Sequence, residues 1–299
     1  MHETVPTVES SPIHQALRQA RGALAAAGCE TPDLDAEVLL AHVLQCSRAW
    51  LYAHALDRLT AEQAAAYRSL VERRAGRQPV AYLVGHKEFF GLDFLVTPDV
   101  LIPRPETEQL VELALNLAPH RTARLFAADV GTGSGALAVS LAWHLPQARI
   151  LAGDISAAAL AVARQNAARH GVGERVLCVQ ADLLPARAGG FELILANLPY
   201  LSPADLRRAA PEVADWEPRL ALDGGANGLA AVRRLLARAG ESLRTGGALL
   251  VEIGAGQGTA VSELARRHFP QAAVEIVRDL AGLERILVVR LGAIRRQHL

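Results

Sequence analysis

Short apolar runs alternate with helix-length segments over residues 125 to 290, and this alternation constrains the fold more than any other feature. The apolar runs are candidate strands at 125–130, 149–154, 175–179, 191–196, 247–253 and 284–290. Strands that alternate with helices predict a mostly parallel sheet covered by helices on both faces. Such sheets bind ligands at the carboxyl ends of their strands, so we expect the functional residues to follow these runs.

The first part of the chain predicts a small helical domain. Between residues 11 and 76, helix start and stop signals recur without an alternating strand pattern. Ser11-Pro12 and Thr31-Pro32 each place a capping hydroxyl before a proline, and Thr60-Ala61-Glu62-Gln63 fits a capping box. Several short helices with an apolar stripe are therefore expected here.

Between these two parts, the run Phe89–Val96 has the aromatic and branched content of a hairpin, with Gly91 in its turn region. We interpret it as a connection between domains. The predicted boundaries are a helical domain at 1–84, a hairpin linker at 85–102 and an α/β domain at 103–299.

Composition argues against several classes of protein. The chain has 299 residues, of which 51% are hydrophobic, and this suits two packed domains. Its 31 basic and 31 acidic residues give a net charge of zero. A neutral chain is a poor candidate for a protein that mainly grips a nucleic-acid backbone, so no direct nucleic-acid partner is expected.

Cysteines and apolar stretches limit the cellular setting. Cys29, Cys46 and Cys178 are scattered and form no C-x-x-C pair, so the sequence predicts neither disulfides nor a metal site. Residues 1–4 lack the basic start of a signal peptide, and no apolar stretch approaches the roughly 20 residues that span a bilayer. We expect a protein of the reducing cytoplasm with no membrane partner.

A glycine-rich turn follows the strand at 125–130. Its glycines let the backbone fold tightly and approach a ligand, and the next helix offers free N–H groups. The spacing is G-x-G-x-G rather than G-x-G-x-x-G, and an acid precedes it that would repel a pyrophosphate but could hold an ammonium. The alternative is that the glycines only pack helix on strand. The candidate cofactor-binding residues of this turn are Asp129, Gly131, Thr132, Gly133, Ser134 and Gly135.

Two further acids follow strands. Asp154 ends the run at 149–154, where an acid commonly accepts hydrogen bonds from ribose hydroxyls, although it could instead cap the next helix. Asp182 with Leu183 resembles an acid that receives an adenine amino group beside an apolar wall. The alternative for Asp182 is that it merely terminates the strand.

The tetrapeptide Asn197-Leu198-Pro199-Tyr200 follows the strand at 191–196. The side-chain oxygen of Asn197 and the carbonyl of Leu198 are two acceptors, as many as a primary amide nitrogen with two hydrogens requires. Pro199 fixes the direction of that carbonyl, and Tyr200 can lie against a planar group. Alone, this could be an ordinary turn. In this order with the glycine turn, the motifs favour an enzyme that moves a methyl group from S-adenosylmethionine to a planar amide or amine nitrogen.

At these residues the sequence resembles the PrmC/HemK family of peptide chain release factor glutamine N5-methyltransferases. The resemblance runs from about Arg73 to Arg290 and includes long, specific matches at Arg74–Gly85, Thr97–Glu108 and Trp216–Gly225. The tetrapeptide departs from the family's usual Asn-Pro-Pro-Tyr, because Leu198 replaces the first proline.

The resemblance implies a Rossmann-like class I methyltransferase domain with a seven-stranded sheet whose last strand is antiparallel. It implies S-adenosylmethionine as cofactor, S-adenosylhomocysteine as product, and the glutamine of the release factor Gly-Gly-Gln motif as substrate. The helical domain would dock the release factor, and the tetrapeptide Asn197, Leu198, Pro199 and Tyr200 would bind the glutamine and carry catalysis, with Asn197 also beside the cofactor.

Three alternatives stay open. A related enzyme could methylate a ribosomal protein glutamine. An adenine-N6 nucleic-acid methyltransferase uses a similar tetrapeptide, but the neutral charge and the lack of a target-recognition domain argue against it. A non-catalytic adenosine-binding module would bind cofactor tightly without turnover.

Overall fold

The structure is a computed structural model that describes residues 11–118, 124–185 and 189–292. It divides into two compact units. Of the described residues, one unit contains those up to Gly85 together with Pro211–Trp216, and the other contains those from His86 to Ala210 and from Glu217 onward. Each unit is described by itself.

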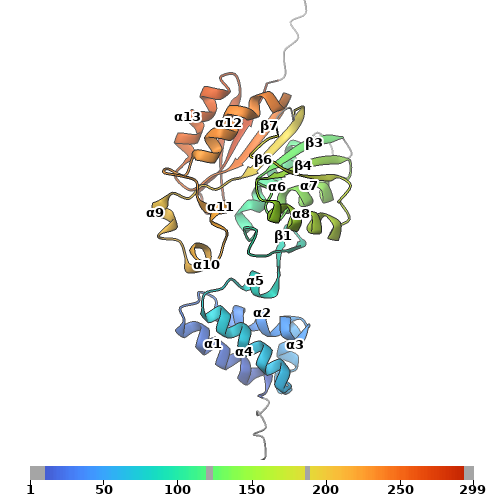
Figure 1. Cartoon of the computed structure of the whole chain (residues 1–299), viewed down its shortest axis with the longest axis vertical. Helices are drawn as coiled ribbons and strands as arrows, with labels where there is room; N and C mark the ends of the chain where they lie inside the picture. The colour runs from blue at the N-terminus through green and yellow to red at the C-terminus, as the bar shows by residue number, and fades with distance from the viewer. Residues whose placement is uncertain (1–10, 119–123, 186–188, 293–299) are drawn as a thin grey trace, which may run out of the picture. The chain divides into compact units, whose positions relative to one another are not determined.

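The first unit is helical (Figure 1, blue) and contains α1 (Ile13–Ala26), α2 (Pro32–Leu44), α3 (Arg48–Ala53), α4 (Ala61–Ala75) and α5 (Val80–Val84). The short helix α10 (Pro211–Ala214) also belongs to it. Its core includes the fully buried Leu24, Leu39 and Leu40. The expected helices are therefore present around one apolar core.

The capping predictions for this unit had mixed outcomes. The capping box of α4 is confirmed, because the Thr60 hydroxyl accepts from the Gln63 N–H and the Gln63 side chain accepts from the Thr60 N–H. The prediction for α1 was wrong, because Pro12 rather than Ser11 is its N-cap. For α2 the positions are confirmed, with Thr31 as N-cap and Pro32 as the first helical residue, but the Thr31 hydroxyl donates to Asp35 Oδ1 at 2.8 Å instead of capping the helix.

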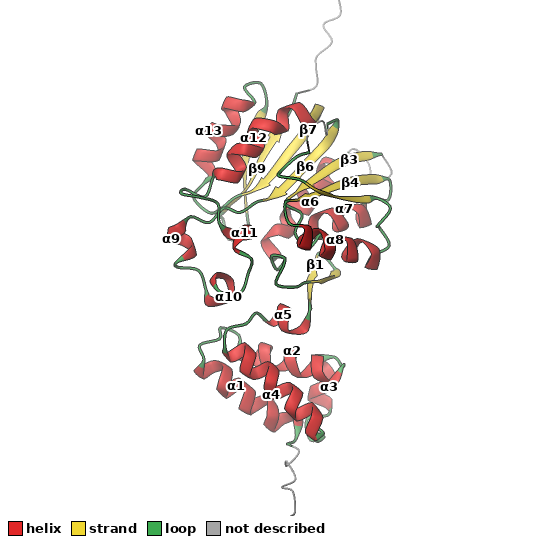
Figure 2. Ribbon diagram, viewed as in Figure 1, coloured by secondary structure: helices red, strands yellow, loops and turns green. Residues whose placement is uncertain are grey.

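The second unit is built on a seven-stranded sheet (Figure 2). Its strand order is β5-β4-β3-β6-β7-β9-β8. The strands are β3 (Leu125–Val130), β4 (Ala148–Asp154), β5 (Val176–Gln180), β6 (Phe191–Asn197), β7 (Leu243–Glu252), β8 (Ala273–Arg278) and β9 (Glu284–Arg290). The last strand, β9, runs antiparallel to both β7 and β8, while β3 to β7 pair in parallel. The predicted Rossmann-like fold class is confirmed.

Helices cover both faces of the sheet because successive strand residues face opposite sides and both sets are apolar. Leu193 and Leu195 pack in one cluster with α6 (Glu108–Leu117) and α7 (Ala136–His144). Ile194 packs in the other, with α12 (Ala230–Ser242) and α13 (Gly258–His268). A further helix, α8 (Ala157–Arg169), follows β4. The carboxyl ends of the parallel strands thereby lie together at one end of the sheet.

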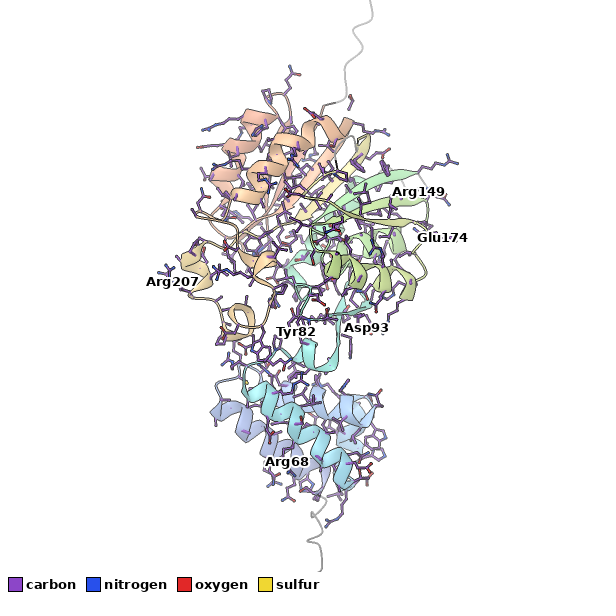
Figure 3. All side chains as sticks on the ribbon, in the orientation of Figure 1. Arg68, Tyr82, Asp93, Arg149, Glu174 and Arg207 are labelled. Atoms are coloured by element: carbon purple, nitrogen blue, oxygen red, sulfur yellow. The ribbon has the colours of Figure 1, made fainter. Side chains whose placement is uncertain are left out.

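The predicted hairpin consists of β1 (His86–Phe89) and β2 (Leu92–Leu95), with positive φ at Phe90 and Gly91 in the turn. It belongs to the second unit, and its Phe89 and Phe94 are buried in the same cluster as α6 and α7. Asp93 (labelled in Figure 3) accepts a hydrogen bond from His86 Nδ1 at 2.7 Å and forms an ion pair with Arg169, which attaches β2 to α8.

The remaining short elements of the second unit are the 3₁₀ turn η1 (Pro105–Thr107), α9 (Pro203–Leu206) and α11 (Arg219–Leu222). They lie in the loops before α6 and after β6. Ligands bind at the carboxyl ends of the strands in such folds, and these loops lie at that end of the sheet. No helix in the described parts of the chain is long and apolar enough to cross a membrane.

Candidate active site

The glycine turn between β3 and α7 requires glycine for two reasons. Gly131, Gly133 and Gly135 all have positive φ, between 54° and 83°, which side chains other than glycine's adopt at a cost. Two of them are also crowded. A Cβ added to Gly131 would lie 3.0 Å from Leu198 Cδ2, and one on Gly135 would lie 3.2 Å from Ala163 Cβ. The turn therefore packs directly against the tetrapeptide after β6.

Asp129 lies beneath this turn and does not line the cavity described below. Its side chain is fully buried, and its Oδ2 accepts from the Thr132 hydroxyl at 2.6 Å and from the Ala138 N–H at 3.1 Å. Burial raises the pKa of Asp129 to about 7. These bonds hold the turn on the first turn of α7, so the acid predicted to face an ammonium acts here on the protein itself.

Asp154 ends β4 and does line the cavity. Its Oδ2 accepts from the Gly133 N–H at 2.9 Å, and its Oδ1 accepts from the Ser156 N–H at 2.8 Å. Ser156, not Asp154, is the N-cap of α8, because the Ser156 hydroxyl accepts from the Ala159 N–H. A carboxylate has about four acceptor positions, so Asp154 retains capacity for ligand hydroxyls.

Asp182 and Leu183 follow β5 and line the same cavity. Asp182 is half-exposed and forms an ion pair with Arg234, which also lines the cavity. Leu183 is buried and has a positive φ of 65°, an unusual backbone for a leucine. The two residues provide one polar and one apolar portion of the wall.

The cavity has a volume of about 350 Å³ and gathers most of the predicted site residues. Of the predicted set, all line it except Asp129, Gly135 and Tyr200. The segments 99–107 and 218–223, which precede α6 and follow Glu217, supply another part of its lining. Residues that follow different strands thus line one cavity, together with several other stretches of chain.

Asn197 is held by a buried chain of hydrogen bonds. Its Nδ2 donates to Thr107 Oγ1 at 3.2 Å, and the Thr107 hydroxyl donates to Glu252 Oε2 at 2.7 Å. Glu252 ends β7 and pairs with Asn197 in the sheet register. Burial raises the pKa of Glu252 to about 7.

Tyr200 lies on the other side of Glu252. Its hydroxyl donates to Glu252 Oε1 at 3.5 Å, and burial raises the pKa of the phenol. The structure therefore directs this hydroxyl toward Glu252, and the predicted contact of the ring with a planar group stays a prediction.

Leu198 contributes its side chain to the core, in addition to any contribution of its carbonyl. Only 4% of Leu198 is exposed, and it packs in the cluster with α12 and α13, against the turn at Gly131. Pro199 follows it at the cavity wall. Leu198, the residue that departs from the family tetrapeptide, thus packs its side chain against the glycine turn.

Sequence reasoning missed four residues of this site. Thr107 and Glu252 hold Asn197, while Arg104 lines the cavity and donates to Glu217 Oε1 at 2.5 Å. Glu217 is buried, which raises its pKa, and its Oε2 has no hydrogen-bond partner among the described residues. One signal was available for Glu252: it is an acid at the end of an apolar strand, as Asp129 and Asp154 are.

The described residues contain no group of three or more His, Cys, Asp or Glu side chains that could hold a metal ion. The lining of the cavity combines the glycine turn, the carboxylates and Asn197 with two arginines, several hydroxyl side chains and apolar side chains.

Comparisons with known proteins match both parts of the chain. Residues 15–85 match the family described as PrmC N-terminal domain, and residues 127–216 match a methyltransferase domain. The release factor glutamine methyltransferase of Moorella thermoacetica is 46% identical over 91% of this chain and 96% of its own length. The protein of the same name from Geobacter sulfurreducens is 43% identical over 94% of this chain and 97% of its own.

Among solved structures, a methyltransferase from Pyrococcus furiosus superposes with a TM-score of 0.51 at 17% identity, covering 75% of this chain and 98% of that one. At this identity the similarity concerns the fold alone.

Proposed function

This chain belongs to the family of release factor glutamine methyltransferases, and on that premise we propose that it transfers a methyl group from S-adenosylmethionine to the side-chain amide nitrogen of the glutamine in the Gly-Gly-Gln motif of peptide chain release factors. The observation that carries the proposal is the state of Asn197. Its nitrogen is engaged by Thr107, which leaves its oxygen as the acceptor available at the cavity.

The cavity suits an adenosine cofactor. Its volume of about 350 Å³ lies within the range of small-molecule sites. Asp154 offers remaining acceptor positions for ribose hydroxyls, and Leu137 and Leu183 offer apolar walls for a base. We assign cofactor contacts to Gly131–Ser134 of the turn, to Asp154 and to Asp182 with Leu183. Asp129 would act indirectly, by holding the turn.

When bound, S-adenosylmethionine supplies an activated methyl group on a sulfonium. The protein has to orient a poor nucleophile, because the lone pair of an amide nitrogen is delocalised into the carbonyl. Asn197 Oδ1 and the Leu198 carbonyl would accept the two amide hydrogens and aim the nitrogen at the methyl group. Positioning of this kind supplies much of the rate enhancement, and no strong base is required before attack. The surplus amide proton leaves to water or Asn197 after the new bond forms.

Mass spectrometry tests the proposal. Release factor is purified from cells with and without this protein, and we expect a single added methyl group on the loop glutamine only when the protein is present. A release factor carrying Glu in place of that glutamine is the matched control and should gain no methyl group. An unmodified loop, with methyl groups instead on a ribosomal protein or on nucleic-acid adenine, would overturn the assignment.

A further inference from the structure

Glu252 is a buried carboxylate whose environment calls for an explanation. It is 1% exposed, yet it forms no ion pair with any described residue. The neighbouring Arg285 is paired with Asp279 at 3.0 Å instead. Burying an unpaired carboxylate is unfavourable, and such groups are frequent at functional sites.

In the structure the Thr107 hydroxyl donates its one hydrogen to Glu252 Oε2. This direction is fixed when Glu252 is ionised, above its raised pKa of about 7, because an ionised carboxylate only accepts. Thr107 Oγ1 then presents only lone pairs toward Asn197. The group of Asn197 that faces it must be a donor, which is the Nδ2 found there at 3.2 Å. The Asn197 oxygen consequently points away from Thr107.

We propose that Thr107 and Glu252 are positioning residues that fix the polarity of the Asn197 amide, and that this polarity makes the site accept a glutamine and reject a glutamate. The inference rests on the proposed function, because it concerns the side chain that Asn197 receives. It adds to that function the feature that selects glutamine over glutamate, namely the orientation of the Asn197 amide.

The reason lies in what each substrate side chain offers. A glutamine nitrogen carries two hydrogens, which match the two acceptors Asn197 Oδ1 and the Leu198 carbonyl. A glutamate carboxylate carries none, so it would face two acceptors with no hydrogen between them. If Asn197 turned over, its Nδ2 would donate to that carboxylate instead. The chain of bonds from Glu252 through Thr107 opposes this turn.

The test separates orientation from general damage by using two substrates. Thr107→Val keeps the shape of the side chain and removes the hydroxyl, whereas Thr107→Ser keeps the hydroxyl. For each full-length variant we measure kcat and KM with a release factor carrying the Gly-Gly-Gln loop. We also measure the inhibition constant of the same release factor with Glu at the loop position. Cofactor affinity and the melting temperature are measured on the same samples.

We expect Thr107→Val to lower kcat by about 10- to 100-fold. The Gln-to-Glu ratio, defined as the inhibition constant of the Glu loop divided by the KM of the Gln loop, should fall by about tenfold, because an Asn197 amide that can turn over donates to the glutamate carboxylate. Thr107→Ser should retain both properties within about threefold. Loss of structure alone would weaken the binding of both loops together and leave their ratio unchanged.

An unchanged Gln-to-Glu ratio in Thr107→Val would overturn the inference, and so would equal losses in the Val and Ser variants. If Thr107→Val does not fold, Glu252→Gln decides, because the amide introduced by this substitution can also donate to Thr107 and should narrow the ratio in the same direction. A wild-type protein that leaves the Gln loop unmethylated would instead refute the proposed function. The two failures are therefore distinct.

Discussion

Asn197 illustrates how a single side chain acquires a role from its partners. An isolated asparagine amide can turn over, but here Nδ2 donates one of its hydrogens to Thr107, and this bond fixes which end of the amide carries the acceptor Oδ1. We predict that Asn197→Ala abolishes methyl transfer while cofactor affinity stays largely intact, because the assigned cofactor contacts belong to other residues. Loss of a buried acceptor costs about 1 to 3 kcal/mol before any loss of alignment. Single-turnover methylation and calorimetric cofactor titration test this, and near-normal turnover would contradict it.

Leu198 shows the opposite case, in which a side chain matters apart from its backbone. The sequence predicts a contribution from its carbonyl, and on that basis a change to proline would mainly reduce unfolded-state entropy. The buried contact of Leu198 with the turn at Gly131 adds a packing contribution. We predict that Leu198→Pro keeps activity within about tenfold but lowers stability by about 1 kcal/mol, since the lost contacts of the buried side chain exceed the entropic gain. Methylation kinetics and melting curves decide, and a raised melting temperature would show that the packing contribution is negligible.

At the scale of elements, apolar periodicity predicted the central sheet well. The observed β3, β4, β6 and β9 each begin and end within one residue of the expected runs. β8 (Ala273–Arg278) was not predicted, because this edge strand has no fully buried residue and its apolar residues are interrupted by Glu275. β7 starts four residues before the predicted run, at Leu243, through the polar stretch Arg244–Gly246.

The site was predictable where the signal was local. Strand-end acids and the two turns are contiguous in sequence, and most of them line one cavity. Thr107 and Glu252 are 145 residues apart, and only the pairing of β6 with β7 brings Glu252 to Asn197. A single sequence carries no signal for such a contact. The burial that places Asp129 beneath the turn is likewise a property of the packed sheet.

Glu212 of α10 connects the segment Pro211–Trp216 to the rest of the helical unit. Glu212 accepts from Arg77 at 2.6 Å and 2.8 Å and from the buried Arg74 at 2.8 Å, and Arg74 also donates to Asp35. Burial alone would raise the pKa of Glu212, but the arginine hydrogen bonds outweigh it and hold this pKa at about 2.

We predict that Glu212→Gln lowers the free energy of unfolding of the helical unit by about 1 to 3 kcal/mol, because hydrogen bonds to charged groups are lost and Arg74 stays buried. Glu72→Gln, on the exposed surface of α4, is the matched control and should change it by less than about 0.5 kcal/mol. Chemical denaturation at neutral pH measures both. Equal small effects would show that the ion pairs around Glu212 add no stability.

For the whole molecule, we expect two buried acids to make the folded state less stable as the pH rises toward neutrality. Burial raises the pKa of Asp129 and of Glu252 to about 7, from ordinary values of 3.8 and 4.5. Between those values the folded state binds more protons than the unfolded state. The stability that these two acids contribute is therefore greatest below the ordinary values and is lost as the pH rises through about 7. The acids with lowered pKa, such as Glu212, change stability only at lower pH.

We therefore predict that the melting temperature falls between about pH 5 and pH 7, and that Asp129→Asn, which mimics the neutral acid, reduces the fall. The variant keeps an oxygen to accept from Thr132 and Ala138. Calorimetric scans of both proteins across this range provide the measurement. An identical pH dependence in the variant would show that Asp129 does not titrate in this interval.

The last prediction concerns the helical unit as a whole. A short Gly-Gly-Gln loop offers little surface, whereas specific protein interfaces bury roughly 1,200 to 2,000 Å². We propose that the helical unit supplies part of the missing area. Removal of residues 1–84 should leave a protein that still binds S-adenosylmethionine, because every residue lining the cavity lies beyond this range. Its kcat/KM for full-length release factor should fall by about tenfold or more, since a loss of about 1.4 kcal/mol in binding already produces that factor.

Truncation also removes Arg74 and Arg77, the partners of Glu212, so a second protein is needed to separate the two effects. Full-length Glu212→Gln loses the same ion pairs while keeping the helical unit. If docking is the cause, the truncated protein loses activity toward full-length release factor but not toward a short Gly-Gly-Gln peptide, and Glu212→Gln retains more activity than the truncated protein. Equal losses in the two proteins would assign the effect to the Pro211–Trp216 segment, and unchanged kcat/KM after truncation would remove the docking role altogether.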